Sequence, residues 1–380
     1  MKKSIKYILI IFLLFQYHST LGATITKSIK ASDGDYTTPA LWEADLDNTT
    51  PYDAGDDAVG ELYDESYLVT SVLTIDGGGT IGLNSVKLSV ASTERSSGTA
   101  GTGARITVNG AISNGVISLV PLAGSDKLTL EYFEINGNGQ ALNVFIFNGN
   151  AGSGRAGILR YLMLHDGSTS IANNYFVRAE DRDIQVQNSI FYDFVATNNR
   201  TIIGLRIDCG LAGGGIFNNI VDNITSHGTG SSTAYQIQKN DADCRLKNNI
   251  GTRTNNVPLD FYFPVGFSLI TSSNNLSDDA TADDGGGSNH VVSATFANMF
   301  VSTTAGSEDY SPQSVSAPQV DLGVDLVTTP TGVNFDFKGR DRDVAGDTWD
   351  IGAIEFVSVG VGTARVIRLH GVRLYGLRLR

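Results

Sequence analysis

A short pattern of alternating apolar and polar residues recurs along the middle of the chain, and each copy breaks at Asn, Asp or Gly. The runs are rich in Ile, Leu, Val and aromatic residues, and they are too short for helices. The copies span residues 128–138, 158–167, 184–193, 216–223, 246–252 and 269–277. A spacing of roughly 30 residues is typical of a stacked array, because one such unit cannot bury its apolar face alone. The pattern therefore predicts a solenoid of β-strands.

Asparagines mark the same phase of successive copies. They occur as pairs followed by Ile or Leu, with a single asparagine at the matching place one copy earlier: Asn218-Asn219, Asn248-Asn249, Asn274-Asn275 and Asn188. Asparagine tolerates the left-handed backbone of a corner, and its side-chain amide can bond to the next coil in a ladder. We therefore predict a parallel β-helix. The alternative, a β-sandwich, predicts strands every ~8–12 residues and no repeated pair at one phase.

The first residues have the pattern of a secretory signal. Three lysines precede an apolar run at residues 7–15, and small residues occur at positions 20, 22 and 23. The apolar run is about half of the ~20 residues that span a membrane. We interpret residues 1–23 as a cleaved signal peptide. This predicts a secreted or cell-surface protein with no transmembrane segment after signal removal.

The remaining chain divides into four parts. Residues 24–60 are expected to form an N-terminal strand and a capping helix, residues 61–298 the β-helix coils, and residues 299–356 a C-terminal cap. Residues 357–380 form a basic tail with a five-residue repeat. The helix is indicated by an N-cap residue, a proline at the first helical position and an apolar stripe: Thr38, Pro39, Leu41, Trp42 and Leu46.

Charge separates the body of the chain from its tail. The net charge is −13, but the leader carries three lysines, the tail carries five arginines and neither carries an acid, so residues 24–356 have a net charge of −21. An acidic body argues against nucleic acid as a partner, because phosphate binding needs clustered Lys and Arg. The basic tail favours docking on the acidic body or on an acidic partner, such as a cell surface. A frayed basic end is the alternative.

The chain has two cysteines, Cys209 and Cys244, about one coil apart. In an oxidising compartment they would form a disulfide between neighbouring coils. The alternative is two small thiols stacked in the core. Neither cysteine has a histidine at a ligand-like spacing, so a zinc site is not expected.

Five short blocks in the C-terminal third resemble the closing segments of a known superfamily. They are Met299-Phe300-Val301, Asp309-Tyr310-Ser311-Pro312, Ala317-Pro318-Gln319-Val320-Asp321-Leu322-Gly323, Gly339-Arg340-Asp341-Arg342 and Asp350-Ile351-Gly352-Ala353-Ile354-Glu355. With the coils, they resemble the secreted right-handed parallel β-helix proteins of the pectate-lyase-like superfamily over most of residues 24–356. The resemblance implies an all-β, right-handed parallel β-helix with an irregular C-terminal cap. Ala317 and Ile354 replace the usual Ser and aromatic residue of the superfamily, and both changes conserve packing.

The resemblance also implies where chemistry would occur. Superfamily members that act on polysaccharides carry charged residues outside successive coils, along a groove parallel to the axis. Lyases of this kind use an Arg or Lys base and acids that hold calcium against a uronate, whereas hydrolases use paired carboxylates. The catalytic candidates are Arg206, Asp208, Lys239 and Asp241. The substrate-binding candidates are His165, Asp166, His227 and Asp243. Calcium is the cofactor that the lyase alternative implies.

The spacing of these candidates supports a shared face only in part. Arg206 and Asp208 lie on one face of a strand at period two, as do Lys239, Asp241 and Asp243 if their strand continues. His227 belongs to only a fragment of the Gly-His-Gly signature of pectin hydrolases. Residues 278–289 are acidic and glycine-rich but lack the EF-hand order, so a solvated loop is expected there. Scattered charges that keep a solenoid soluble are the alternative for the whole set.

Three function classes fit the sequence. A polysaccharide lyase or glycoside hydrolase predicts that the charged candidates converge in one groove. A non-catalytic carbohydrate-binding or surface protein predicts exposed aromatic residues along one face, such as Tyr161, Tyr192, Tyr235 and Phe261. A phage or virus adhesion protein of the tailspike type predicts a homotrimer along the solenoid and attachment through the basic tail. The signal peptide favours the first two classes. We therefore expect a secreted β-helix that engages extracellular polysaccharide, with catalysis left open.

Overall fold

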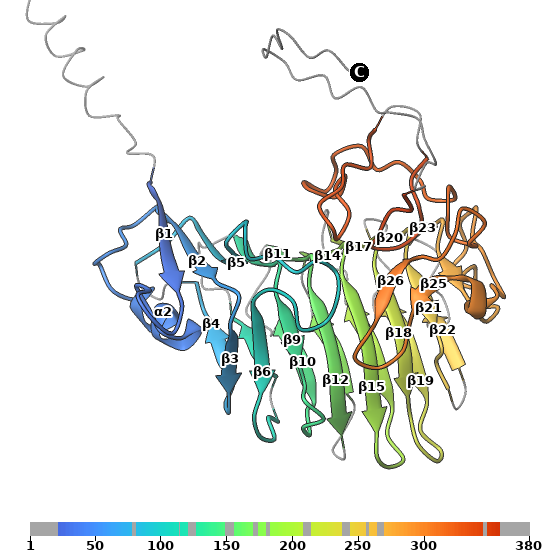
Figure 1. Cartoon of the computed structure of the whole chain (residues 1–380), viewed down its shortest axis with the longest axis horizontal. Coiled ribbons are helices and arrows are strands. Elements are labelled where there is room, and N and C mark those ends of the chain that lie inside the picture. The colour runs from blue at the N-terminus through green and yellow to red at the C-terminus, as the bar shows by residue number, and fades with distance from the viewer. Residues whose placement is uncertain are drawn as a thin grey trace, which may run out of the picture.

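The computed structural model describes residues 22–357 except 78–80, 114, 121–126, 149–155, 170–173, 180–182, 208–213, 238–243, 256–257, 264–269 and 345–347. Within these ranges the chain winds through three parallel sheets that enclose one core (Figure 1). In each coil the chain passes through the nine-stranded sheet, then the eight-stranded sheet and then the seven-stranded sheet, before it returns to the nine-stranded sheet in the next coil. The predicted all-β fold, a parallel β-solenoid, is confirmed.

The strands of each sheet follow one another in sequence order along the array. The nine-stranded sheet contains β1 (Thr24–Ile29), β2 (Asp57–Leu62), β5 (Ser85–Val90), β8 (Lys127–Glu131), β11 (Ala156–Arg160), β14 (Asp183–Gln187), β17 (Gly215–Phe217), β20 (Arg245–Lys247) and β23 (Thr271–Ser273). The eight-stranded sheet contains β3 (Ser66–Val69), β6 (Arg105–Val108), β9 (Glu134–Asn136), β12 (Met163–Thr169), β15 (Ile190–Ala196), β18 (Ile220–Thr225), β21 (Ile250–Thr252) and β24 (Leu276–Ser277). The seven-stranded sheet contains β4 (Leu73–Ile75), β7 (Ile117–Leu119), β10 (Val144–Asn148), β13 (Asn174–Ala179), β16 (Ile202–Ile207), β19 (Ser232–Ile237) and β22 (Pro258–Tyr262).

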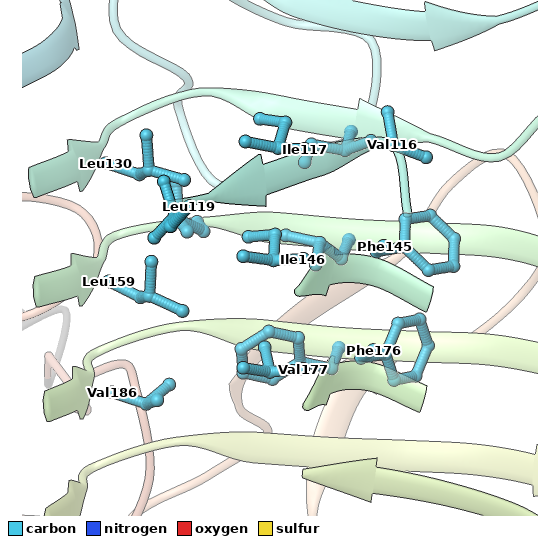
Figure 2. Packing of buried hydrophobic residues seen from close by; sticks show 14 of the residues in the cluster. Val116, Ile117, Leu119, Leu130, Phe145, Ile146, Leu159, Phe176, Val177 and Val186 are labelled. Carbon is cyan, nitrogen blue, oxygen red and sulfur yellow. The ribbon is translucent and has the colours of Figure 1, made fainter. Parts of the chain in front are cut away.

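Stacked apolar side chains form the core of the solenoid. On the nine-stranded sheet, Leu130 pairs in register with Leu159, which pairs with Val186, and all three are buried. Ile146 on the seven-stranded sheet stacks in the same way between neighbouring coils (Figure 2). Burial of each such side chain contributes about 1.5–3 kcal/mol. Identical registers in successive coils therefore hold the array together.

The turn from the nine-stranded to the eight-stranded sheet explains the repeated asparagines. Its first residue has a left-handed backbone in six successive coils: Tyr132, Tyr161, Asn188, Asn218, Asn248 and Asn274. The second residue of the pair points into the core. There, Asn249 Nδ2 donates to Asn275 Oδ1 at 3.1 Å, and its Oδ1 accepts the backbone N–H of Asn219 at 3.1 Å. The predicted asparagine ladder is confirmed.

The helix expected near the N-terminus is α2 (Pro39–Asp45). The Thr38 side chain accepts the N–H of Leu41 at 3.3 Å, as an N-cap residue does. Trp42 is fully buried and donates from Nε1 to the hydroxyl of Tyr52 at 3.0 Å. Leu41, in contrast, is 53% exposed. The apolar stripe of this helix is therefore narrower than the sequence predicts: Trp42 and Leu46 are buried, but Leu41 is not.

Residues 278–292 close the backbone of the last coil. The N–H of Ser277 donates to Val291, and the N–H of Asn274 donates to Ser288. Side chains take part as well, since Asp279 accepts the N–H of Asp260 at 3.0 Å. The acidic segment that the sequence suggests as a solvated loop thus uses some of its oxygens to satisfy strand β22.

The C-terminal region, residues 299–356, packs against the outer face of the eight-stranded sheet. It contains the antiparallel pair β25 (Phe300–Ser302) and β26 (Asp309–Pro312), preceded by the 3-10 helix η1 (Phe296–Asn298), and is otherwise irregular. Its apolar residues and those of the sheet form one buried cluster that includes Tyr192, Ile220 and Tyr310. Figure 1 shows this region, in orange to red, beside the later coils.

Buried charges hold the C-terminal region in shape. The guanidinium of Arg342 pairs with Glu355 and donates to the carbonyl of Gly352 at 2.9 Å. Arg342 is only 2% exposed, so this pair is shielded from water.

Cys244 is buried, and it is disulfide-bonded. Cys209 lies outside the described residues, so its predicted role in that bond stays a prediction.

Candidate functional site

A groove of about 670 Å³ follows the outer face of the seven-stranded sheet. It spans coils from β4 to β16. Its lining combines aliphatic, small polar, aromatic and cationic side chains: Val72, Thr74, Ser113, Ser118, Val120, Asn143, Val144, Phe147, Tyr175, Arg178 and Arg206. The groove therefore runs across the strands, along the direction in which the coils stack.

Strand register explains why these side chains face outward together. Equivalent positions in successive strands are occupied by Thr74, Ser118, Phe147, Arg178, Arg206, Gln236 and Tyr262. The neighbours of Arg178 in its strand, Val177 and Ala179, are fully buried. Parallel strands lie about 4.8 Å apart, so the outer positions form a closely spaced row. We call this series the outer row.

A second set of side chains forms the floor beside the outer row. Val144, Tyr175 and Ile203 pack together outside the core, with Phe147 against them. Two consecutive core residues separate the floor from the outer row in each strand, as the buried Phe176 and Val177 do in β13. Residues of both sets, such as Tyr175 of the floor and Arg178 of the outer row, line the groove.

Aromatic rings hold the two arginines of the groove. The guanidinium carbon of Arg178 lies 5.6 Å from the ring centre of Phe147 and 5.4 Å from that of Tyr175. The guanidinium of Arg206 lies 5.8 Å from the same tyrosine ring, and its Nη1 donates to the Tyr175 hydroxyl at 3.2 Å. Cation–π contacts of this kind favour a fixed position for each guanidinium. Tyr175 is itself only 2% exposed, so it is a rigid support.

The predicted catalytic residues, and the substrate-binding candidate Asp243, are only partly described. Arg206 lies in the groove, in register with Arg178. Asp208, Lys239, Asp241 and Asp243 lie outside the described residues; in sequence, they follow closely after β16 and β19. Their roles stay predictions. Sequence reasoning missed Arg178, although the segments that contain Arg178 and Arg206 share an apolar-Arg-apolar pattern that could have revealed their equivalence.

His165 and Asp166 lie on a different sheet from Arg206. His165 projects from β12 and is only 3% exposed. Its Nε2 lies 3.0 Å from Glu134 and its Nδ1 lies 3.0 Å from Asp166, while its ring stacks on Tyr192 at 4.8 Å. Burial alone would lower the pKa of His165, but the hydrogen bond with Asp166 and the nearby carboxylate of Glu134 outweigh it and raise the pKa to about 9. This geometry suits a charged imidazolium held between two carboxylates.

His227 lies in the turn between β18 and β19. With Arg200 it lines an open hollow of about 530 Å³, together with Thr197, Asn198 and Asn199. None of these five residues lines the groove. Among the described candidates, the structure therefore places Arg206, His165 and His227 at three separate locations.

The aromatic residues expected on an exposed face are buried. Tyr161, Tyr192, Tyr235 and Phe261 are each 2% exposed or less, so that expectation is wrong. Tyr161 and Tyr192 belong to the apolar cluster beneath the C-terminal region, whereas Tyr235 and Phe261 stack on each other in the core. Alternation alone does not show which outer face a distant segment covers. Tyr262, in the outer row, is 36% exposed.

Comparison with known proteins does not assign this site to a protein family. No protein-family model matches the chain, and no curated protein has a significantly similar sequence.

In the part of the chain that the structure describes, no three His, Cys, Asp or Glu side chains are grouped as metal ligands. The same part contains no helix with the length and apolar character needed to cross a membrane.

Proposed function

We propose that the protein binds an acidic polysaccharide in the groove of the seven-stranded sheet. One observation carries the proposal: Arg178 and Arg206 stand in register on adjacent strands, and both pack on Tyr175. A guanidinium presents a planar set of donors that matches carboxylate and sulfate groups. Two guanidiniums about one strand spacing apart therefore suit a ligand that repeats its negative charge.

The rest of the lining also fits a sugar chain. Phe147 offers an aromatic surface next to Arg178, and Thr74 and Ser118 add hydroxyl groups in the same outer row. Sugars combine apolar ring faces with hydroxyl groups, so a mixed wall of this kind complements them. Because the row runs along the axis, an extended polymer would lie across successive coils.

The wider identity that we propose is a secreted member of the pectate-lyase-like superfamily. The parallel β-solenoid and the resemblance of the C-terminal blocks support it. The signal-like pattern of residues 1–23 also supports it, although residues 1–21 lie outside the described residues. In a lyase, Arg206 would serve as the base that removes a proton from the uronate. Binding without cleavage is the adhesion alternative, and one experiment separates the two.

The experiment measures binding and cleavage on the same protein. The purified full chain is titrated with polyuronate, a sulfated glycan and a neutral glycan, with and without calcium, and reducing ends and unsaturated-product absorbance are followed. We expect the acidic glycans to bind and the neutral glycan to bind at least about tenfold more weakly. Arg178→Ala and Arg206→Ala should each weaken binding by about fivefold to tenfold.

Arg245→Ala is the matched control, because Arg245 projects from β20 of the nine-stranded sheet. Equal affinity of the double variant Arg178→Ala/Arg206→Ala and the native protein would refute the proposal. Product that disappears in Arg206→Ala but persists in Arg245→Ala would identify a lyase. Binding without product would favour the adhesion alternative.

A further inference from the structure

A second concave surface lies in the C-terminal region. This hollow has a volume of about 460 Å³. Asp321 and Asp341 line it with exposed side chains, and neither carboxylate forms an ion pair with any described residue. The hollow therefore presents negative charge that its surroundings do not neutralise.

The cations beside these carboxylates are already engaged. Arg342 is buried and pairs with Glu355, and Arg340 donates to the carbonyl of Glu355 at 2.7 Å and lies 3.9 Å from Asp336. These contacts hold the C-terminal region together, as described above. A ligand for the hollow should therefore supply positive charge.

Exposed valines surround the same hollow. Val315 is 67% exposed, and Val344 and Val357 are each 49% exposed. These valines give the hollow apolar groups beside its carboxylates. The ligand should thus carry apolar groups next to its positive charges.

The chain itself contains a segment with this chemistry. Val357 lines the hollow, and the basic repeat begins only ten residues further along the sequence, at Ile367. In the repeat, arginines alternate with Ile, Leu and Val around Arg368, Arg373 and Arg378. In an extended segment, successive side chains point to opposite sides, and because the repeat has an odd number of residues, Arg368 and Arg378 would lie on one side and Arg373 on the other. Each side of the repeat would therefore carry both cationic and apolar side chains.

We propose that residues 367–380 of the chain dock in this hollow, with Arg368 and Arg378 of one side against Asp321 and Asp341 and with neighbouring apolar residues against the valines. Docking within one molecule is favoured because a short linker gives an effective concentration in the millimolar range. A second copy of the chain could reach the hollow only by free diffusion. The repeat is therefore an intramolecular ligand of the C-terminal region.

The test follows tryptic cleavage at the arginines of the tail. In the full chain, we expect cleavage at Arg368, Arg373 and Arg378 to be about tenfold slower than in a free peptide of residues 358–380, because cleavage follows the undocked population. The double variant Asp321→Asn/Asp341→Asn should recover most of the difference. Added salt should do the same, because exposed charge pairs are screened.

Asp64→Asn/Asp283→Asn is the matched control, because it removes the same charge from exposed sites outside the hollow. Unfolding of the body, monitored by tryptophan fluorescence, should be alike in both double variants. Cleavage of the native tail as fast as that of the peptide would overturn the proposal. Protection that persists in Asp321→Asn/Asp341→Asn would overturn the assignment to this hollow. Protection that rises with protein concentration would assign the site to the tail of a second copy instead.

Discussion

Asn248 and Val324 exchange two hydrogen bonds, although 76 residues separate them in the sequence. Asn248 Nδ2 donates to the Val324 carbonyl at 2.8 Å, and the Val324 N–H donates to Asn248 Oδ1 at 2.8 Å. The side-chain amide thus pairs with a peptide group as a neighbouring strand would. The other asparagines at the first position of this turn donate to carbonyls of the same region: Asn188 to Gly332, Asn218 to Val333 and Asn274 to Leu322. One series of turn residues therefore fastens the C-terminal region to the coils.

Loss of the Asn248 amide should loosen this attachment. Asn248→Ala removes both bonds, leaves polar groups of Val324 without partners and places alanine at a φ of 59°. We expect a loss of about 2–3 kcal/mol in the free energy of unfolding, measured with urea. Asn248→Gly separates the two causes, because glycine adopts a positive φ without strain and should cost less. Faster hydrogen exchange at the Val324 amide should accompany both variants, and unchanged exchange would contradict the attachment.

Substitutions in the core ladder of Asn219, Asn249 and Asn275 should lower the free energy of unfolding more than substitutions of the asparagines that bind the C-terminal region. Asn249 is fully buried, and its amide bonds to Asn219, Asn275 and the carbonyl of Ile216. Asn249→Leu would leave several of these groups unsatisfied in the core, at a cost of about 3 kcal/mol or more. Urea unfolding monitored by circular dichroism measures this cost. A Leu variant as stable as the native protein would show that the ladder is a result of the fold and does not stabilise it.

The sequence predicted the solenoid because the turn residues leave a local signal. The paired asparagines have the same phase in successive coils, and their left-handed backbone and core ladder follow from properties of the residue itself. The same signal is absent earlier, where Tyr132 and Tyr161 occupy the equivalent turn positions. These tyrosines stack on each other at 4.5 Å, and Arg95 lies 3.5 Å from the ring centre of Tyr132. Stacked rings thus take the place of the first asparagine of the turn in these coils, and a search for asparagine pairs misses them.

The candidate site was harder to predict because its residues come together only through the register of neighbouring strands. Arg206 was found from its charge, whereas Arg178 was missed because the asparagines and glycines of the seven-stranded sheet, such as Asn174 and Gly204, do not recur at one strand position. The burial of Tyr161 was also missed. Its hydroxyl bonds to the carbonyl of Gly332, 171 residues away, and no local pattern reveals a contact of that kind. The turns could be predicted from the properties of individual residues. Which outer faces of the sheets stay exposed depends on contacts between residues that are far apart in the sequence.

Gly60 allows α2 to pack closely on the first coils. A Cβ atom at this position would lie 2.7 Å from Trp42 Cε2 and 2.9 Å from Ile29 Cδ1, both of them in the core. Gly60→Ala should therefore lower the free energy of unfolding by about 1–3 kcal/mol, through overpacking. Tryptophan fluorescence during urea unfolding reports on this site directly.

Combination with Trp42→Phe tests the cause of this effect. A smaller ring would leave room for the added methyl group, so Gly60→Ala should cost less in the Trp42→Phe background than in the native protein. Because this background lacks Trp42, circular dichroism should measure both costs. Equal costs in the two backgrounds would show that the methyl group does not meet the indole ring.

The His165 cluster should make stability fall at alkaline pH. The groups that face His165 are Glu134, Asp166 and Tyr192, and the two carboxylates favour the charged imidazole. Because the pKa of His165 is raised from 6.5 to about 9 in the folded chain, its contribution is fully present below about pH 6.5 and is lost as the pH rises through about 9. The expected size is roughly 2 kcal/mol, since the partner Asp166 is half exposed and is screened by water.

The difference in free energy of unfolding between the native protein and His165→Gln isolates this contribution. Other titrating groups act on both proteins and largely cancel in the difference. We expect the difference to be largest near pH 6 and to shrink by roughly 2 kcal/mol up to pH 9.5. Glu134→Gln should remove much of the same pH dependence, because it removes the buried partner of Nε2. A difference that stays constant over this range would mean that His165 is neutral in the folded chain, and that its two carboxylate contacts are ordinary hydrogen bonds.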